Sequence, residues 1–77
     1  MIDKLVEFLK ENIDSKDIEL ASDSIWEERI PLRIANYKLY AEIIDLIDEF
    51  ISDNDLSEDW FDDLGLDIEE LFEERLM

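Results

Sequence analysis

Residues that form tight turns or break helices are almost missing from this chain of 77 residues, because glycine and proline occur once each, at Gly65 and Pro31. A β-rich fold needs many such residues in its turns. Hydrophobic residues make up 47% of the chain and aromatic residues 10%, whereas disordered acidic segments are poor in aromatic and β-branched residues. The sequence therefore predicts a single all-α domain over residues 1–77, a small compact helical bundle.

Apolar residues that recur at intervals of three and four predict three main helices in this bundle. They cover about residues 2–13, 32–51 and 67–76. Asp67 is a good N-cap for the last one, because Glu70 follows three residues later as in a capping box. One or two short helices complete the prediction.

The predicted helix over residues 32–51 is the longest and carries two neighbouring apolar stripes. One stripe begins at Ile34 and Tyr37 and continues through Ile44, and the other contains Ile43 and Phe50. A helix that is apolar over so wide an arc packs against neighbours on two sides. We therefore expect this helix at the centre of the bundle.

Cap signals predict short helices between the first and the longest helix. Ser15 can cap a helix over residues 16–21, and Ser24 with Glu27 forms a capping box for another one that ends before Pro31. These signals predict two short helices that are separated near Ser24.

A further short helix is predicted around Trp60, with Ser57 as its N-cap and Gly65 in the left-handed position that ends it. Tryptophan in a small bundle usually lies in the core, which is the first expectation for both Trp26 and Trp60. Trp60 lies within a dense acidic stretch, where it can also anchor an interface.

The negative charge is concentrated in the second half of the chain. The formal net charge is −17. Residues 1–38 hold nine acidic and six basic side chains, a net charge of −3, whereas residues 39–77 hold fifteen acidic and one basic, a net charge of −14. Rows of carboxylates usually keep a small protein soluble, but such surfaces normally mix both signs of charge. The imbalance favours a functional role for these rows.

Helical spacing places these carboxylates in rows. Within a row, side chains three or four residues apart lie about 5–6 Å from one another, and phosphates along a nucleic-acid strand repeat on a similar scale. We predict that three rows and one tryptophan form a partner-binding surface. Its residues are Glu42, Asp45, Asp48 and Glu49; Glu58, Asp59, Trp60, Asp62 and Asp63; and Glu69, Glu70, Glu73 and Glu74.

The composition argues against several classes of function. A chain this acidic repels phosphate, so we expect no direct binding to nucleic acid or to an anionic membrane. It has no cysteine or histidine, and so lacks a thiolate nucleophile, a zinc–thiolate site and the side chain used most often for acid–base catalysis. Asp53-Asn54-Asp55 begins like a calcium loop, but the required Gly and Glu are replaced by Glu58 and Leu64. We expect a cytoplasmic protein that is not an enzyme and has no metal site or cofactor.

Two functions fit this description. The first is an inhibitor that blocks the basic, nucleic-acid-binding surface of a partner such as a nuclease or another nucleic-acid-binding effector. In size and charge, though not in any motif, the chain resembles bacterial immunity proteins, antitoxins and phage-encoded inhibitors. The alternative is a helical adaptor or regulatory subunit that binds its partner through an apolar groove. Electrostatic mimicry weakens steeply with salt and apolar docking does not. The protein itself is expected to be a monomer or a weak homodimer.

Overall fold

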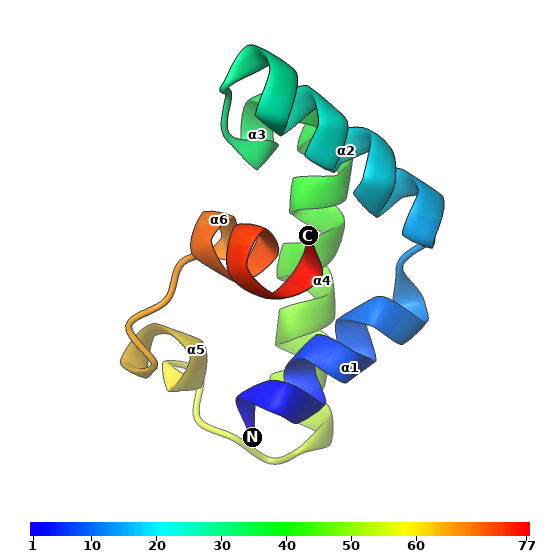
Figure 1. The fold of residues 1–77 in the computed structure, drawn as a ribbon. Coiled ribbons are helices and arrows are strands. Elements are labelled where there is room, and N and C mark those ends of the chain that lie inside the picture. Colours follow the sequence, from blue (N-terminus) through cyan, green and yellow to red (C-terminus); the bar gives the residue numbers. More distant parts are fainter.

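The helix α4 (Tyr37–Asp53) is the longest element and runs along the length of the molecule (Figure 1). The computed structural model describes all residues from 1 to 77. α1 (Ile2–Asn12) and the C-terminal segment pack against α4. That segment consists of α6 (Ile68–Leu71) and the π-helical turn η1 (Phe72–Leu76), which continues it. The predicted central position of this helix is therefore confirmed.

Three further helices surround this centre. α2 (Ser15–Glu28) crosses one end of the molecule and packs on the short α3 (Leu32–Ala35), and α5 (Trp60–Asp63) lies near the other end (Figure 1). The chain has no strand, and its radius of gyration of 12.2 Å is close to the ~11.5 Å of a compact domain of this length. The prediction of an all-α globule is confirmed.

The core contains fourteen buried residues, all of them hydrophobic. They come from every helix, and no buried side-chain nitrogen or oxygen lacks a hydrogen-bond partner. Residues of the helices predicted at the two ends of the chain meet in this core, as shown by Leu5, Leu9, Leu71 and Phe72. The fourteen residues are Leu5, Leu9, Ile13, Ala21, Ile25, Leu32, Leu39, Ile43, Ile47, Phe50, Phe61, Leu71, Phe72 and Leu76.

The prediction of two short helices between the first and the longest helix is wrong, because α2 is one continuous helix of 14 residues. Its N-cap is Asp14, whose carboxylate accepts a hydrogen bond from the Lys16 amide at 2.9 Å. Ser24 lies inside the helix and caps nothing. Ala21 and Ile25 are buried on the inner face of α2, so packing holds the helix together across the cap signal. The three longest helices are thus α1, α2 and α4.

The predicted helix over residues 32–51 is interrupted at Asn36, which separates α3 from α4. The Asn36 side chain accepts a hydrogen bond from the Leu39 amide at 3.0 Å and caps α4. The break changes which apolar residues face the core. Ile34 is 64% exposed and Tyr37 72% exposed, although both belong to a predicted apolar stripe, whereas Leu39 is buried.

The predicted turn between α5 and α6 is confirmed at two residues. Gly65 has φ +75°, the left-handed conformation that glycine adopts without strain. The Asp67 carboxylate accepts a hydrogen bond from the Glu70 amide at 2.8 Å and caps α6. The cap predicted at Ser57 is wrong, since α5 begins at Trp60 and has no side-chain cap.

The two tryptophans lie in different environments, and the predicted core position is wrong for Trp26. Trp60 is half-buried, with its ring 5.7 Å from that of Phe50, which in turn lies 5.6 Å from the ring of Phe8. Trp26, which was expected in the core, is 77% exposed on α2. The continuous α2 is the reason, because it directs Ile25 into the core and the neighbouring Trp26 outwards.

Replacing Asn36 with alanine tests the role of this cap. The variant loses the acceptor for the Leu39 amide, and we expect it to lower the free energy of unfolding by about 1 kcal/mol. For a domain of this size, that corresponds to a decrease of about 4–8 °C in the melting temperature. Asn36→Asp is the matched control because it keeps the acceptor, and it should retain the parental melting temperature. Equal melting temperatures for the alanine variant and the parent would contradict the assignment.

Candidate functional site

A groove between α4 and the segment that contains α5 brings two of the predicted acidic rows together. Its floor is apolar and contains Tyr40, Ile44, Ile47, Ile51, Phe61, Leu66 and Ile68. Its rim carries the carboxylates of Asp48, Glu58, Asp62 and Asp67. The hollow has a volume of about 300 Å³ and continues past Ser52 and Leu56. We call this feature the acid-rimmed groove.

The carboxylates of the rim have no basic partner within the protein. Only two ion pairs form in the whole chain, Arg33 with Glu69 at 3.8 Å and Arg75 with Asp3 at 3.6 Å. Asp48, Glu58 and Asp62 are exposed and take no part in a side-chain hydrogen bond. The groove is therefore a site of uncompensated negative potential, because low-dielectric walls beside charges of one sign strengthen the local field.

The arrangement matches the chemistry of lysine and arginine side chains. These side chains bury their aliphatic stems along apolar surface while their charged heads stay in a polar environment. In the acid-rimmed groove the stems can lie on Ile44 and Ile51, and the heads can reach Asp48, Glu58 or Asp62. Charge-assisted hydrogen bonds of this kind are about twice as strong as neutral ones.

The predicted row on α4 is divided between two sides of that helix. Only Asp48 lines the groove. Glu42, Asp45 and Glu49 are exposed, and a rotation of about 100° per residue places Glu42 and Glu49 on the far side of α4 from Ile44 and Asp45 on its flank. The structure therefore does not bring the whole row to one face.

The predicted row on α5 is divided in the same way. Glu58 and Asp62 line the groove, whereas Asp59 and Asp63 are exposed and do not. The half-buried Trp60 packs on Phe50, so only part of its ring reaches the surface. These positions extend the negative charge around the groove without forming its wall.

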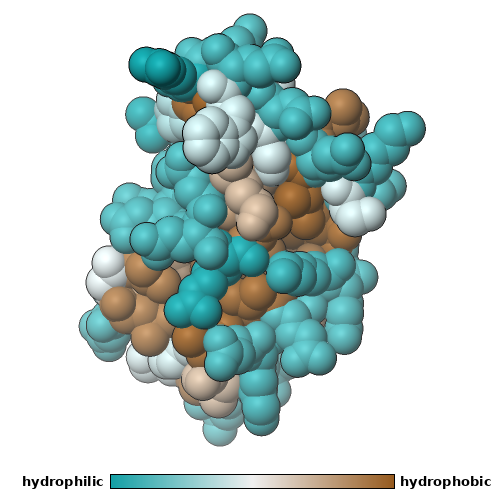
Figure 2. All heavy atoms as spheres, viewed as in Figure 1, coloured by the Kyte–Doolittle hydropathy of each residue, from teal (hydrophilic) through white to brown (hydrophobic).

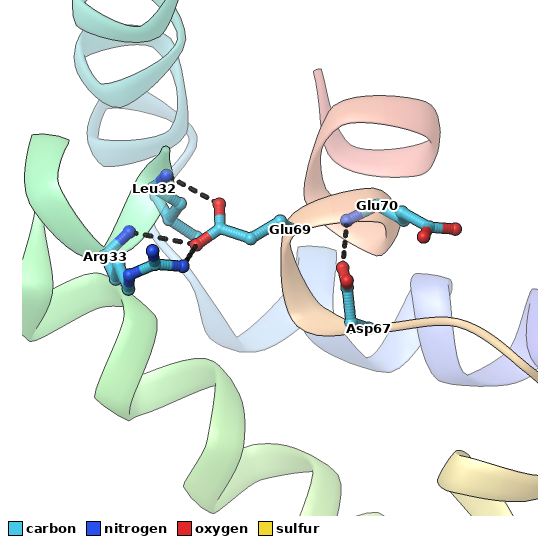
Figure 3. Close-up of polar contacts among 5 residues, drawn as sticks. All are labelled: Leu32, Arg33, Asp67, Glu69 and Glu70. Carbon is cyan, nitrogen blue, oxygen red and sulfur yellow. Dashed lines mark hydrogen bonds and ion pairs between the residues drawn. The ribbon is translucent and has the colours of Figure 1, made fainter. Parts of the chain in front are cut away.

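Glu69, in the third row, has a structural partner. Its carboxylate accepts hydrogen bonds from the backbone amides of Leu32, at 2.6 Å, and Arg33, at 3.2 Å (Figure 3). These amides belong to the first turn of α3, where backbone amides have no partner within the helix. The N-cap residue of α3 is Pro31, and no side chain next to it in the sequence caps the helix. Glu69 thus joins α6 to α3 across 37 residues of chain.

The rest of the third row is exposed and lies away from the acid-rimmed groove. Glu70, Glu73 and Glu74 make no side-chain hydrogen bond and no ion pair. Glu73 lines a different cleft, beside Trp26 on α2. The third row therefore combines one structural carboxylate with three free ones.

The sequence prediction missed the apolar part of the site. Ile44 is 38% exposed on the groove floor, although it was assigned to a core stripe. Leu66 and Asp67 complete the wall, although Asp67 was predicted only as a helix cap and no role was predicted for Leu66. The only sequence feature that indicated an apolar groove floor was the width of the apolar arc on α4. This arc is wider than the part of α4 that faces the core.

No group of acidic side chains is arranged to hold a metal ion, and no helix is long and apolar enough to cross a membrane. Comparisons of the chain with protein-family models, curated proteins and solved structures found no match. The fold and the groove define a small acidic helical protein whose most distinctive surface combines free carboxylates with an apolar floor.

Replacing Glu69 with glutamine tests the structural role of this carboxylate. The variant keeps the size of the side chain but loses the charge that strengthens both hydrogen bonds. We expect a loss of about 1–2 kcal/mol in the free energy of unfolding, measured by urea denaturation. Arg33 is largely exposed, so its ion pair contributes little to this loss. Glu70→Gln is the matched control and should leave the stability unchanged or raise it. Equal effects of the two substitutions would contradict the role of Glu69.

Salt should stabilise the protein, because two ion pairs cannot balance a net charge of −17. Repulsion between exposed charges is screened within ~8–10 Å at 0.1–0.15 M salt. We expect the melting temperature to rise when NaCl is increased from low to moderate concentration. Potassium chloride is a suitable control, because it should act equally if screening is the cause. A decrease would mean that attractive ion pairs outweigh the repulsion.

Proposed function

We propose that the protein is an inhibitor that occupies the basic, nucleic-acid-binding surface of a partner protein in the cytoplasm. The observation that carries this proposal is the set of three unpaired carboxylates, from Asp48, Glu58 and Asp62, around the apolar floor of the acid-rimmed groove. The chain acts by binding and needs no catalytic group. Its partner is a nuclease or another nucleic-acid-binding effector, as for the immunity and anti-defence classes of inhibitor.

The chemistry of the partner follows from what the groove can accept. A surface that binds phosphates is lined with lysine and arginine, and those side chains have the aliphatic stems and charged heads that fit this groove. The exposed carboxylates of Asp45, Glu49 and Asp59 add a wider negative field, which speeds association with a basic partner. Binding of this kind competes directly with nucleic acid for the same side chains.

The adaptor alternative uses the same groove in another way. In that case Ile44 and its apolar neighbours supply the affinity, and the carboxylates only form a polar rim. The exposure of Ile44 is the observation that favours this alternative. The two functions differ in how the affinity responds to salt and to the loss of charge.

A neutralised groove tests the proposal. We expect the variant with Asp48→Asn, Glu58→Gln and Asp62→Asn to bind at least about tenfold more weakly to the basic protein that the parent captures from lysate. The loss should appear mainly as slower association at low salt and should shrink as NaCl is raised. Surface plasmon resonance with the captured protein immobilised measures both rates.

The matched control removes three charges elsewhere, by Glu7→Gln, Glu11→Gln and Glu19→Gln. These residues are exposed and make no side-chain hydrogen bond, so this variant should bind nearly as tightly as the parent. An equal loss in both triple variants would show that only the total charge matters. If Ile44→Ser abolishes binding and the neutralised groove binds normally at every salt concentration, the adaptor function is correct.

A further inference from the structure

A second surface, on the other side of the fold from α5, surrounds the exposed Trp26. The cleft is lined by Ile25, Trp26, Arg29, Ile30, Pro31, Glu73 and Met77 and has a volume of about 820 Å³. In Figure 2, pale and brown atoms lie between teal side chains in the middle of the molecule, where α2 faces the C-terminal turn. We call this surface the Trp26 cleft. It shares no residue with the acid-rimmed groove.

Trp26 is the most exposed of the aromatic residues. Its exposed fraction of 77% is the largest among the exposed large hydrophobic residues. Burying a tryptophan removes about 150–250 Å² of surface from water, and tryptophan is among the residues that contribute most to interfaces. The ring therefore provides a strong driving force for a contact that the single chain does not make.

Arg29 is a free cation on one wall of this cleft. It takes part in neither of the two ion pairs, although the chain holds 24 acidic residues. Its backbone has φ +55° at the C-cap of α2, a left-handed conformation in which glycine would avoid the strain. An unpaired arginine beside an exposed tryptophan favours an occupant that carries a carboxylate.

The opposite wall of the cleft carries such a carboxylate, from Glu73, which is also unpaired. A two-fold contact requires a surface that is complementary to itself. Here a second copy would bring its Glu73 to Arg29 and its Arg29 to Glu73, with both Trp26 rings buried between the two clefts. A basic partner would instead meet Arg29 as a repulsive charge.

We propose that the Trp26 cleft is the interface of a weak two-fold homodimer of this chain. The part of the interface formed by α2 and α3 comes from residues 1–38, whose net charge is only −3. Most of the charge that makes two copies repel each other therefore lies outside the contact. Salt strengthens the dimer because it screens the remaining repulsion. The two acid-rimmed grooves stay open, so the dimer can bind two basic sites at once and gain affinity from their linkage.

Sedimentation of the full chain tests this interface. We expect the parent to pass from monomer to dimer between about 10 µM and about 1 mM, with a dissociation constant that falls as NaCl is raised. Trp26→Ser should remain a monomer over this range. Its melting temperature at low protein concentration should equal that of the parent, since the ring is exposed.

Charge reversal then tests the geometry. Arg29→Glu and Glu73→Arg should each weaken the dimer at least about tenfold. In either variant, residues 29 and 73 of the two copies carry charges of the same sign at both symmetry-related contacts. An equimolar mixture of the two variants should restore dimerisation, since every contact again pairs opposite charges. Lys38→Glu and Glu70→Arg are controls with the same charge changes outside the cleft, and they should not show this pattern of loss and rescue.

Three results would overturn the proposal. The first is a parent that stays monomeric throughout the concentration range. The second is a dimer that Trp26→Ser does not weaken, which would place the interface elsewhere. The third is a mixture of the two charge-reversed variants that dimerises no better than either variant alone.

Discussion

Repulsion between carboxylates is the constraint on which the rest of this structure depends. Fourteen buried apolar side chains must hold together a chain with a net charge of −17 and only two internal ion pairs. Burial of charge without a partner is too costly in so small a core, and no charged residue is among the fourteen. The consequence is a molecule in which most carboxylates lie at the surface without a partner inside the protein.

Glu69 shows how the same chemistry serves the fold. In the sequence it is one member of an acidic row, yet its carboxylate caps the first turn of α3 and joins distant segments. Glu70, the next residue, points about 100° away around α6, and Glu73 lies in the π-helical turn that follows. Both carboxylates stay free. Whether a carboxylate is structural or available thus depends on which amides the tertiary fold brings to it.

Local interactions explain why part of the structure could be predicted. The caps at Asp67 and the left-handed Gly65 depend on residues within the same turn, and both predictions are confirmed. The break at Asn36 also has a local cap, but the apolar periodicity on both sides of Asn36 predicted one continuous helix. The exposure of Trp26 depends on how helices pack, which periodicity does not encode. In the candidate site, spacing along each helix predicted the acidic rows. It could not show that Asp48 and Asp62 meet across one groove, since that depends on the position of α5 beside α4.

In the proposed function, the acid-rimmed groove and nucleic acid compete for the same basic surface of the partner. Fluorescence anisotropy tests it most directly, with a labelled oligonucleotide bound to the protein that this chain captures. Addition of the chain should return the anisotropy to the value of the free oligonucleotide, and more chain should be needed when the oligonucleotide concentration is raised. An anisotropy that stays high or increases, because both ligands bind together, would contradict the claim.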